Sequence, residues 1–459
     1  MAQDFIELID QQRTYFNAGQ TRNLQNRKKH LLLLKTLLKE NEGKLMEAIK
    51  SDFGKSSFET FATEFALLYM DIGESLNNMH RWAKPKRVGT NLFNLPGKSF
   101  IHKEPYGVTL VIGAWNYPYQ LSLAPAIAAI AAGNTVILKP SELPAATSKI
   151  MAELINSNFP KEVFHVVEGD ASITESLLEN RFDYLFFTGS DRVGRIVYEK
   201  AAKYLTPVTL ELGGKSPAMV LTDADIKVAA RRIVWGKFLN SGQTCIAPDY
   251  ILAHRSIAAR LKTALIEEIK KNDYSLTNGN YVQVINEKNM VRLDALIEKE
   301  FVVFGGEVDF DHRTISPTLM HIPSWDAKCM QEEIFGPILP ILEFDDLDEV
   351  LTKIKERPSP LALYVFSSNQ ATQKKIMSEV PFGGGCINDT IMHITNSSLP
   401  FGGIGTSGMG NYHGEAGFKT FTHEKSVFKK PTFFELKLKY PPYNTGKFNL
   451  LRRFVKWLS

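Results

Sequence analysis

The sequence predicts an α/β protein built from two or three domains. At 459 residues the chain is too long for one core of ordinary size. Short apolar, β-branched segments alternate with helix-like segments between residues 108 and 203. Repeated strand–helix–strand units imply a parallel sheet covered by helices on both faces. A hydrophobic content of 44% with 23% charged residues is typical of a soluble globular protein.

The first 82 residues are predicted to be mostly helical. Apolar residues recur at helical spacing over 4–50 and 57–82. Pro85 ends this pattern, and the sequence Pro96-Gly97-Lys98 predicts a hairpin turn. The first twelve residues contain acids and lack a basic region followed by an apolar one, so we expect no signal peptide.

The regular alternation follows. Strands are expected at 108–112, 135–138, 163–167 and 184–187, and helices at 121–132, 145–156, 174–178 and 193–203. Residues 105–138 contain no charge, which raises the alternative of a membrane span. Pro118, Pro125 and Asn116 interrupt that run and favour a buried strand, loop, helix and second strand.

The second half repeats this style. Strands are expected at 218–221, 250–253, 301–304, 338–344, 363–367 and 386–388, with helices at 229–238 and 257–270. From residue 381 the composition shifts to loop. A second α/β domain therefore follows the first.

Polar residues follow three of the predicted strands, where ligands of parallel sheets bind. Asn116 offers an amide that could stabilise an oxyanion, although Asn before Tyr-Pro is also an ordinary turn residue. Lys139 and Glu142 could bind a phosphate and a ribose diol, or simply cap a solvated helix. These alternatives stay open at the level of spacing.

Small residues mark the next strand end. Gly189 and Ser190 stand at a strand-to-helix turn, and Gly194 lies one turn into the helix. A dinucleotide could lie against this helix N-terminus, where free N–H groups favour phosphate. Because the G-x-G-x-x-G pattern is absent, this turn alone is weak evidence for dinucleotide binding.

The segment from Leu210 to Tyr250 combines a carboxylate, a glycine pair and a cysteine. Glu211 precedes Gly213-Gly214, and Cys245 lies 34 residues after Glu211. A thiolate attacks carbonyl carbon, and a carboxylate can take a proton from a thiol or water. A free cysteine is more often buried and inert, so the pair is not decisive alone.

The remaining candidates are less specific. Glu333 and Phe335 could contact a ribose and a flat ring, or form an ordinary turn before Gly336-Pro337. Cys329 and Cys386 are expected to be structural. The three cysteines give no disulfide framework and fit a reducing compartment, and the ten scattered histidines predict no metal site.

The basic charge belongs to the C-terminal tail. Residues 436–459 carry six Lys/Arg and no acid, so the other residues have a net charge of −2 and give no reason to expect nucleic-acid binding. Phe448, Leu451, Val455 and Leu458 share a helical face. This helix could dock on the protein or on a dimer partner, or lie on a membrane surface.

Seven motifs, taken in chain order, resemble those of the aldehyde dehydrogenase superfamily over about residues 4–432: AWNYP, LKPSE, FTGS, ELGGKSP, GQTCIAPDY, EEIFGP and LPFGGIGTSGMG. GQTCIAPDY, GMGNYHG and the short N-terminus are similar to the class 3 branch, which includes fatty and aromatic aldehyde dehydrogenases. Together the seven are far more specific than any one alone.

The resemblance implies a catalytic role for three residues. Cys245 matches the nucleophile that gives a thiohemiacetal, while Asn116 and the Cys245 backbone N–H match the oxyanion hole. Hydride transfer to a nicotinamide leaves a thioester. Glu211 matches the base that activates the hydrolytic water. In fatty-aldehyde relatives a helix near the tail lies at the substrate entrance, which makes an entrance helix a further hypothesis here.

The resemblance also implies cofactor contacts. Lys139 and Glu142 match the adenosine ribose contacts, Gly189 and Ser190 the pyrophosphate and adenine neighbourhood, and Glu333 and Phe335 the nicotinamide ribose side. In this family the cofactor sits differently from the usual Rossmann mode, which fits the missing glycine pattern. The cofactor is NAD or NADP. Glu142 favours a free 2′-hydroxyl, but class 3 relatives often accept NADP as well.

The predicted protein is thus an aldehyde dehydrogenase-like α/β enzyme that oxidises a medium- or long-chain or aromatic aldehyde to the acid. A Rossmann-like NAD(P)-binding domain is assigned to 1–82 and 103–210, an α/β catalytic domain to 211–418, a small β oligomerisation extension to 83–102 and 419–432, and a basic amphipathic tail to 433–459. We expect a homodimer in the cytoplasm, and peripheral attachment to a membrane is the alternative location.

Three rival functions are weighed. A CoA-acylating aldehyde dehydrogenase needs no hydrolytic base, which Glu211 argues against. A cysteine thioesterase or other hydrolase would need neither Lys139 nor Phe335. A non-catalytic binding protein on the same fold is disfavoured because Cys245 and Glu211 are both present.

Overall fold

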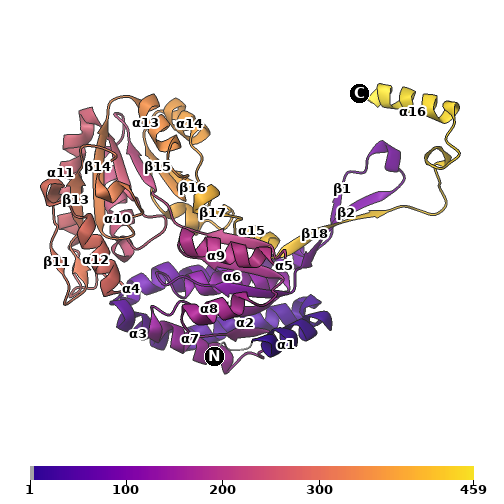
Figure 1. Ribbon diagram of the computed structural model, residues 1–459, viewed down its shortest axis with the longest axis horizontal. Coiled ribbons are helices and arrows are strands. Elements are labelled where there is room, and N and C mark those ends of the chain that lie inside the picture. Colours follow the sequence, from indigo (N-terminus) through magenta and orange to yellow (C-terminus); the bar gives the residue numbers. More distant parts are fainter. Residues whose placement is uncertain (1–4, 459) are drawn as a thin grey trace. The chain divides into compact units, whose positions relative to one another are not determined.

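The computed structural model describes residues 5–458, which divide into two compact units. The main unit comprises residues 5–82 and 105–422, and the small unit comprises 83–104 and 423–458. Figure 1 labels many of the elements in both units.

The first sheet of the main unit has six strands in the order β17-β7-β6-β3-β4-β5. Every residue of β3, β4 and β6 is buried, as expected for central parallel strands covered on both faces. The strands are β3 (Val108–Ile112), β4 (Thr135–Lys139), β5 (Phe164–Val166), β6 (Tyr184–Thr188), β7 (Val208–Glu211) and β17 (Gly408–Met409). β17 alone is antiparallel, with Gly408 opposite Glu211 and Met409 opposite Leu210.

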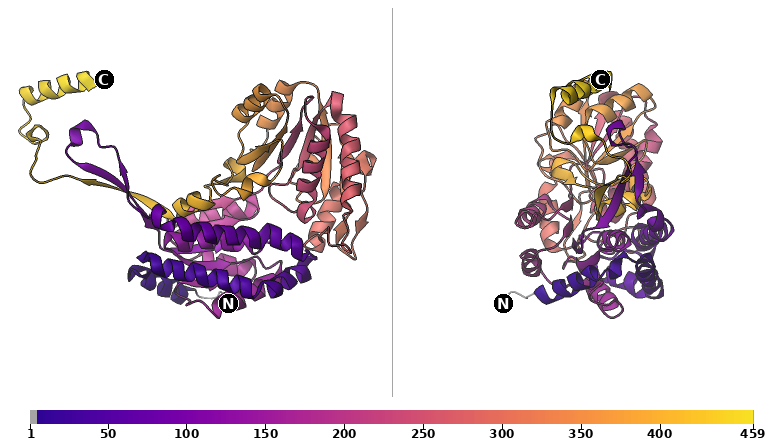
Figure 2. Two further views of the ribbon diagram at one scale, coloured as in Figure 1. Left: turned by 180° about the vertical axis from the view of Figure 1, so that it is seen from behind. Right: turned by 90° about the vertical axis from the view of Figure 1, so that its right-hand side faces the viewer.

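Helices cover both faces of this sheet. Apolar residues of α1, α8 and α9 form one core with alternate residues of β3. Helix α6 packs against β3 and β4, and helices α2, α5 and α15 pack against α6. Figures 1 and 2 show these helices grouped around the first sheet. They are α1 (Ile6–Asn17), α2 (Leu24–Glu40), α3 (Glu42–Phe53), α4 (Ser57–Thr60), α5 (Ala66–Trp82), α6 (Gln120–Ala132), α7 (Ala145–Asn156), α8 (Ala171–Leu178), α9 (Asp191–Ala202) and α15 (Gly414–Thr420).

The second sheet has seven strands in the order β10-β13-β14-β9-β8-β15-β16, parallel except for the edge strand β10. The strands are β8 (Pro217–Val220), β9 (Tyr250–His254), β10 (Val302–Phe304), β13 (Thr318–His321), β14 (Ile338–Phe344), β15 (Ala362–Phe366) and β16 (Gly384–Ile387). Its helices are α10 (Ile226–Phe238), α11 (Arg255–Asn272), α12 (Glu287–Leu296), α13 (Leu347–Lys355) and α14 (Gln370–Glu379). A short ribbon joins β11 (Val308–Asp309) to β12 (Thr314–Ile315).

The small unit holds a three-stranded sheet and a terminal helix. β1 (Lys86–Val88), β2 (Lys98–Pro105) and β18 (Thr422–Lys429) lie in that order, so two segments far apart in the sequence form one sheet. β1 and β2 are antiparallel, and Pro96-Gly97 lies in the connection between them. The last element is α16 (Thr445–Leu458).

The predicted α/β fold with two α/β sheets and a small β extension is confirmed. The uncharged run from 105 to 138 forms β3, α6 and β4, and no described helix is both long and apolar enough to cross a membrane. The sequence did not predict β7 or the helices α12 to α14. Gly408-Met409, assigned from the sequence to the second domain, pairs with β7 in the first sheet. The domain limits themselves remain predictions.

Candidate active site

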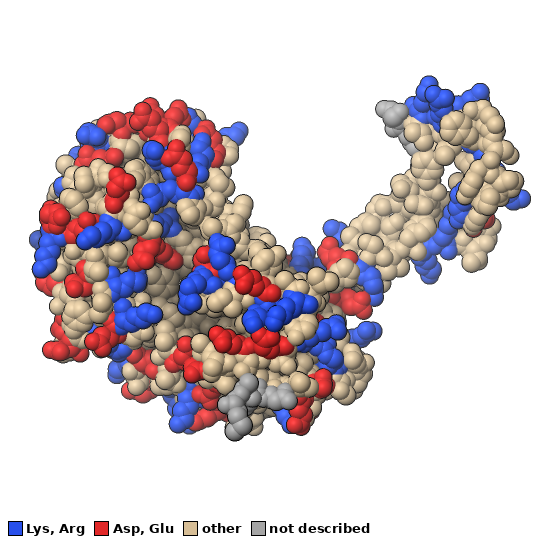
Figure 3. Space-filling model, in the orientation of Figure 1, with Lys and Arg blue, Asp and Glu red and all other residues tan. Residues whose placement is uncertain are grey.

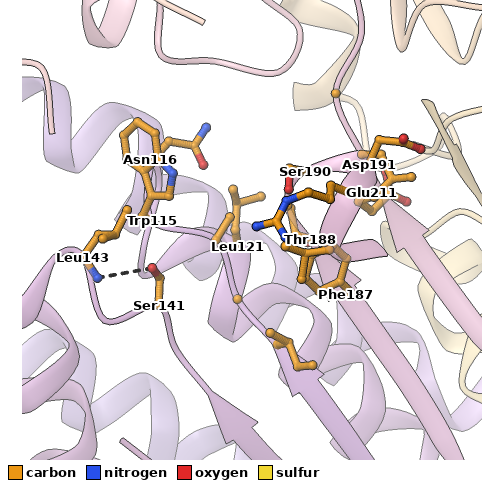
Figure 4. Close-up of a pocket in the computed structure, with 18 of the residues that line it drawn as sticks. Trp115, Asn116, Leu121, Ser141, Leu143, Phe187, Thr188, Ser190, Asp191 and Glu211 are labelled. Carbon is orange, nitrogen blue, oxygen red and sulfur yellow. Dashed lines mark hydrogen bonds between the residues drawn. The ribbon is translucent and has the colours of Figure 1, made fainter. Parts of the chain in front are cut away.

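A cavity of about 740 Å³ lies at the carboxyl ends of the first sheet's parallel strands. Nine of the ten residues predicted for the site line it: Asn116, Lys139, Glu142, Gly189, Ser190, Glu211, Cys245, Glu333 and Phe335. Figure 4 shows Trp115 and Asn116, which follow β3, on one side and Thr188, Ser190 and Glu211 on the other. The strand ends therefore assemble one site, as parallel sheets do.

The side chain of Lys139 is buried at the end of β4. Its Nζ donates to the Pro140 carbonyl oxygen over 2.9 Å and to Glu142 Oε2 over 3.2 Å. The Glu142 side chain is 45% exposed. An ammonium held in place beside an accessible carboxylate can bind hydroxyl groups of a sugar.

The N-terminus of α9 faces the cavity. A Cβ on Gly189 would lie 2.6 Å from the Phe187 ring, so only glycine fits at this turn. Ser190 is the N-cap residue, but its side chain makes no capping hydrogen bond. Free N–H groups at a helix N-terminus favour an anion such as phosphate.

Gly194 differs from the prediction in its place. It lies inside α9 and is not among the cavity-lining residues. A Cβ there would come within 2.7 Å of Leu212 Cδ2, so the glycine lets α9 pack closely against the chain after β7. Its predicted contact with the cofactor stays a prediction.

Three successive residues in the left-handed region precede the cysteine. Asn240, Ser241 and Gly242 have φ angles of 52°, 52° and 72°. Such angles cost about 1 kcal/mol or more at residues other than glycine and persist only where the surroundings fix them. A Cβ on Gly242 would lie 2.2 Å from the Gly336 carbonyl oxygen, which makes this glycine obligatory.

Buried amides hold this loop. Asn240 Nδ2 donates to the carbonyl oxygens of Asn116 and Gln243 over 3.0 and 3.1 Å. Gln243 Nε2 donates to the Gln283 carbonyl oxygen, and its Oε1 accepts from the Ile285 N–H. Asn240 Oδ1 has no partner among the described residues, but the five side-chain hydrogen bonds of Asn240 and Gln243 tie the loop together and to two other segments and favour one conformation. Cys245 is therefore carried on a rigid support.

Asn116 lies beside the nucleophile loop. Its Nδ2 donates to the Gln243 carbonyl oxygen over 3.0 Å. An amide carries two N–H bonds, and this bond uses one of them. The side chain is 3% exposed, so its orientation is set by packing as well as by the hydrogen bond.

The thiol of Cys245 is protonated at neutral pH in the cofactor-free protein. Burial, and next the charges of Glu333 and Glu211, raise its pKa to about 12. The backbone N–H groups of Cys245 and Ile246 lie against the sulfur and act in the opposite direction. Attack on a carbonyl therefore requires a group that accepts the thiol proton.

Glu211 is a buried carboxyl group without a partner. It is 3% exposed, and neither carboxyl oxygen has a hydrogen bond among the described residues. Burial raises its pKa well above the usual range. Because a buried carboxyl group normally has a partner, this one is suited to a water molecule or ligand in the cavity.

Two glycines lie against the carboxyl group of Glu333. The Gly214 N–H donates to its carboxyl group, and a Cβ on Gly213 would lie 1.9 Å from Glu333 Oε2. Burial, and next the charge of Asp249, raise the pKa of Glu333 to about 8. Lys215 pairs with Asp249 and also donates to the Glu332 carbonyl oxygen, which anchors the segment.

Phe335 completes this wall. Its φ is 47°, and its ring meets Trp115 edge-on with 5.4 Å between ring centroids. Arg292 Nη2 donates to the Ile334 carbonyl oxygen over 2.8 Å. Two aromatic rings at the cavity can flank a flat ligand.

Sequence reasoning missed Trp115 and Arg292, which line the cavity, and Asn240, which holds the nucleophile loop. Arg292 looks like an ordinary polar residue of an amphipathic helix, so no local pattern marks it. Asn240 stands between a helix and the cysteine motif, which was the one available signal. Cys329 is buried, and Cys386 Sγ lies 3.5 Å from His393 Nδ1; neither lines the cavity. Within the described chain, no group of three or more His, Cys, Asp or Glu residues could hold a metal ion.

Comparison with known proteins identifies the family. The model of the aldehyde dehydrogenase family matches residues 1–427. This chain belongs to the aldehyde dehydrogenase family. It is 46% identical over 448 residues to 4,4′-diaponeurosporen-aldehyde dehydrogenase of Staphylococcus aureus, covering 97% of both chains. It is 43% identical to aldehyde dehydrogenase family 3 member B1 of Rattus norvegicus, covering 97% of this chain and 96% of the relative.

Solved structures agree with this assignment. The substrate-bound state of Staphylococcus aureus AldH matches with a TM-score of 0.96 and 45% identity, covering 99% of this chain and all of that one. An aldehyde dehydrogenase of Mycobacterium tuberculosis complexed with NAD⁺ matches with a TM-score of 0.83 and 26% identity, over 93% and 90% of the two chains. The predicted family, its class 3 character and the NAD(P) cofactor class are confirmed.

Proposed function

We propose that this chain oxidises an uncharged aldehyde to the carboxylic acid through a covalent thioester on Cys245, with NAD or NADP as the oxidant and water as the acyl acceptor. One observation carries the proposal. Cys245 lines the same cavity as the buried, unpartnered carboxyl group of Glu211. A nucleophile and a base without competing partners are what covalent aldehyde oxidation needs.

The cavity residues fit a dinucleotide. Lys139 and Glu142 would hold the adenosine ribose, and the α9 N-terminus at Ser190 would hold the pyrophosphate. Glu333 would hold the second ribose and Phe335 would flank the nicotinamide. When bound, the nicotinamide accepts the hydride that leaves the former aldehyde carbon.

The first task of the protein is to generate the nucleophile. Because burial raises the pKa of Cys245 to about 12, a carboxyl group must accept the proton as sulfur attacks. The ionised form of Glu211 can do so from the cavity wall through a water molecule, and because burial raises the pKa of Glu211, the share of this form grows as the pH rises. The sulfur–carbon bond forms as the carbonyl π pair moves to oxygen, which gives an oxyanion.

The second task is to stabilise that oxyanion. The Asn116 amide and the Cys245 backbone N–H supply two donors beside the sulfur. Since the buried hydrogen-bond network already holds Asn116, these donors are aligned before the substrate arrives. Preorganised donors of this kind are worth roughly 3–4 kcal/mol each in the transition state.

The third task is hydrolysis of the thioester. Glu211 would take a proton from water while the water oxygen attacks the acyl carbon, and Cys245 would leave as the thiolate. The absence of a hydrogen-bond partner for Glu211 among the described residues supports this role, because the carboxyl group is free to bind water. A CoA-acylating enzyme would have no use for such a base.

The surroundings of Cys245 favour an apolar substrate. Tyr412 is fully buried and close enough to Cys245 for the two groups to interact electrostatically. An aromatic side chain near the nucleophile suits a medium- or long-chain or aromatic aldehyde better than a charged one.

Compartment and assembly follow from further observations. Three free cysteines support a reducing, cytoplasmic setting. The sheet formed by β1, β2 and β18 has two edge strands, and an edge strand is a ready site for pairing with a second copy. We therefore propose a homodimer that pairs through the small unit.

Absorbance at 340 nm tests the proposal. Purified protein is mixed with straight-chain and aromatic aldehydes and with NAD or NADP, and reduced cofactor is recorded. Activity should vanish in Cys245→Ala but persist in the matched control Cys386→Ala, whose thiol lies outside the cavity. Glu211→Gln should abolish steady turnover because the thioester is not hydrolysed, and since Glu211 also accepts the thiol proton, the single reduced cofactor per site should form more slowly than in the wild type.

Three results would contradict parts of this account. Steady turnover by Glu211→Gln within threefold of wild type would exclude Glu211 as the hydrolytic base. Turnover that requires CoA would support the acylating alternative. Hydrolysis without cofactor, or failure to bind cofactor, would support a thioesterase or a non-catalytic binding protein.

A further inference from the structure

Positive charge is concentrated in the small unit. Its two segments, 83–104 and 423–459, contain 14 Lys/Arg and three Asp/Glu, while the other 400 residues contain 40 Lys/Arg and 47 Asp/Glu. The net charge of +4 therefore combines +11 in the small unit with −7 elsewhere. Figure 3 shows many blue and few red side chains on the visible face of the small unit.

The surface of the terminal helix α16 has two halves, of which one is apolar and the other is basic. At 3.6 residues per turn one half carries only large apolar residues beyond the first turn: Phe448, Leu450, Leu451, Phe454, Val455 and Trp457. The other half carries Arg452, Arg453 and Lys456, and the helix contains no acid. The separation into an apolar and a basic half is complete after Lys447.

The apolar half is largely uncovered within the small unit. Phe448 is 61% exposed and Trp457 74% exposed, and Leu450, Leu451 and Val455 are exposed as well. Phe454 is the exception, because its ring meets Phe93 with 4.7 Å between centroids. That contact ties α16 to the connection between β1 and β2 and leaves most of its apolar half open.

We propose that α16 is an interfacial helix that binds an anionic lipid surface, with its apolar half among the acyl chains and its arginines at the headgroups. A helix of 14 residues is about 21 Å long, too short to span a bilayer but suited to lie in its plane. The apolar half gains by burial and the basic half by attraction to phosphate groups, and the two effects act together.

Other occupants fit these features less well. A nucleic acid would use the basic half and leave the large apolar side chains in water. A second copy of this chain could cover the apolar half, and its main unit has a net charge of −7, but that charge is spread over 400 residues, whereas an anionic membrane presents a continuous negative surface. An anionic membrane uses both halves at once, which is why we prefer it.

Co-sedimentation of the full chain with vesicles tests the proposal without using enzyme activity. Binding is compared for vesicles of 30% phosphatidylglycerol in phosphatidylcholine and for pure phosphatidylcholine. We expect binding to the anionic vesicles that weakens with added salt, together with a blue shift of emission that Trp457→Phe abolishes. Each basic residue near an anionic surface contributes about fivefold, so Arg452→Gln with Arg453→Gln should weaken binding about 30-fold.

Two further variants make the result specific. Lys28→Gln with Lys29→Gln removes two adjacent, exposed lysines from α2 and should leave vesicle binding unchanged. Val455→Asp should abolish binding through the apolar half. Circular dichroism and thermal unfolding confirm that each variant is folded.

Several outcomes would overturn the proposal. Equal binding to neutral and anionic vesicles would remove the role of the basic half, and equal losses in both paired variants would make the effect one of net charge. Absence of vesicle binding would reject the membrane. If Val455→Asp then converted a dimer to a monomer, α16 would be an interface between copies, and if the chain instead bound DNA or RNA, the basic surplus would serve nucleic acid.

Discussion

We predict that replacing Lys237 by methionine stabilises the protein at neutral pH. Lys237 lies in the last turn of α10 and is 0% exposed. Its Nζ has no hydrogen-bond partner among residues 5–458. A buried amine without a partner is unfavourable, and methionine fills a similar volume without the charge.

The magnitude follows from the shift of the lysine pKa. Burial lowers it from 10.5 to about 8, against the smaller opposing effect of Asp249. A shift of this size lowers the free energy of unfolding by about 3 kcal/mol when the amine is charged. The unfolded chain binds the proton more tightly, so the penalty is complete below pH 8 and disappears above pH 10.5.

Urea unfolding followed by tryptophan fluorescence measures the effect. With a slope of about 3 kcal/mol per molar urea, Lys237→Met should raise the midpoint by about 1 M at pH 7. At pH 9.5 the gain should fall below half of that value, because the buried amine of the wild type is then mostly neutral. Lys227→Met removes an exposed lysine from the same helix and should change the midpoint little at either pH.

Two results would refute the reasoning. A lower midpoint for Lys237→Met at pH 7 would mean that the amine has a stabilising partner. A gain of the same size at pH 7 and pH 9.5 would mean that packing, and not the charge, sets the difference.

Three shorter predictions concern the cavity. Gly213→Ala should raise the dissociation constant for NAD at least tenfold, since the new Cβ displaces the Glu333 carboxyl group, whereas Gly73→Ala has open space and should not; calorimetry decides. Alkylation of Cys245 by iodoacetamide in the cofactor-free protein should quicken about tenfold per pH unit from pH 7 to 11, because burial raises the thiol pKa to about 12, and a plateau below pH 9 would contradict this. Asn116→Ala should slow turnover by two to three orders of magnitude, and a rate within threefold of wild type would exclude its oxyanion role.

Much of the fold could be predicted because many of its strands are short runs of apolar residues bounded by turn residues. β3 and β14 have the predicted bounds, since five or more apolar residues between turn signals read as a buried strand. β7 escaped prediction because Pro207-Val208-Thr209-Leu210 is short and runs directly into the Glu211 motif. Helices α12 to α14 mix polar and apolar residues, and their helical character depends on packing against the second sheet.

The site could be predicted where its residues stand in contiguous motifs at strand ends. Nine of those residues share one cavity, although their roles remain predictions. The sequence could not show that Gly194 lies outside the cavity lining, because its close neighbour Leu212 comes from another strand end. Nor could it show the burial of Lys237 or the place of Arg292 at the cavity. Their environment is made by chain segments far away in the sequence, which no local spacing reveals.

The two-residue strand β17 has a consequence for synthesis of the protein on the ribosome. Strand β7, which carries Glu211, is the edge of the first sheet until Gly408 and Met409 pair with it. Some 200 residues must therefore be translated while that edge stays open. An unpaired edge can recruit other strands, so the nascent chain should depend on a chaperone during this interval. A chain truncated before residue 408 should then form aggregates rather than a soluble fragment that binds cofactor. Expression of the truncated and the full chain, with the soluble fraction of each measured, tests this.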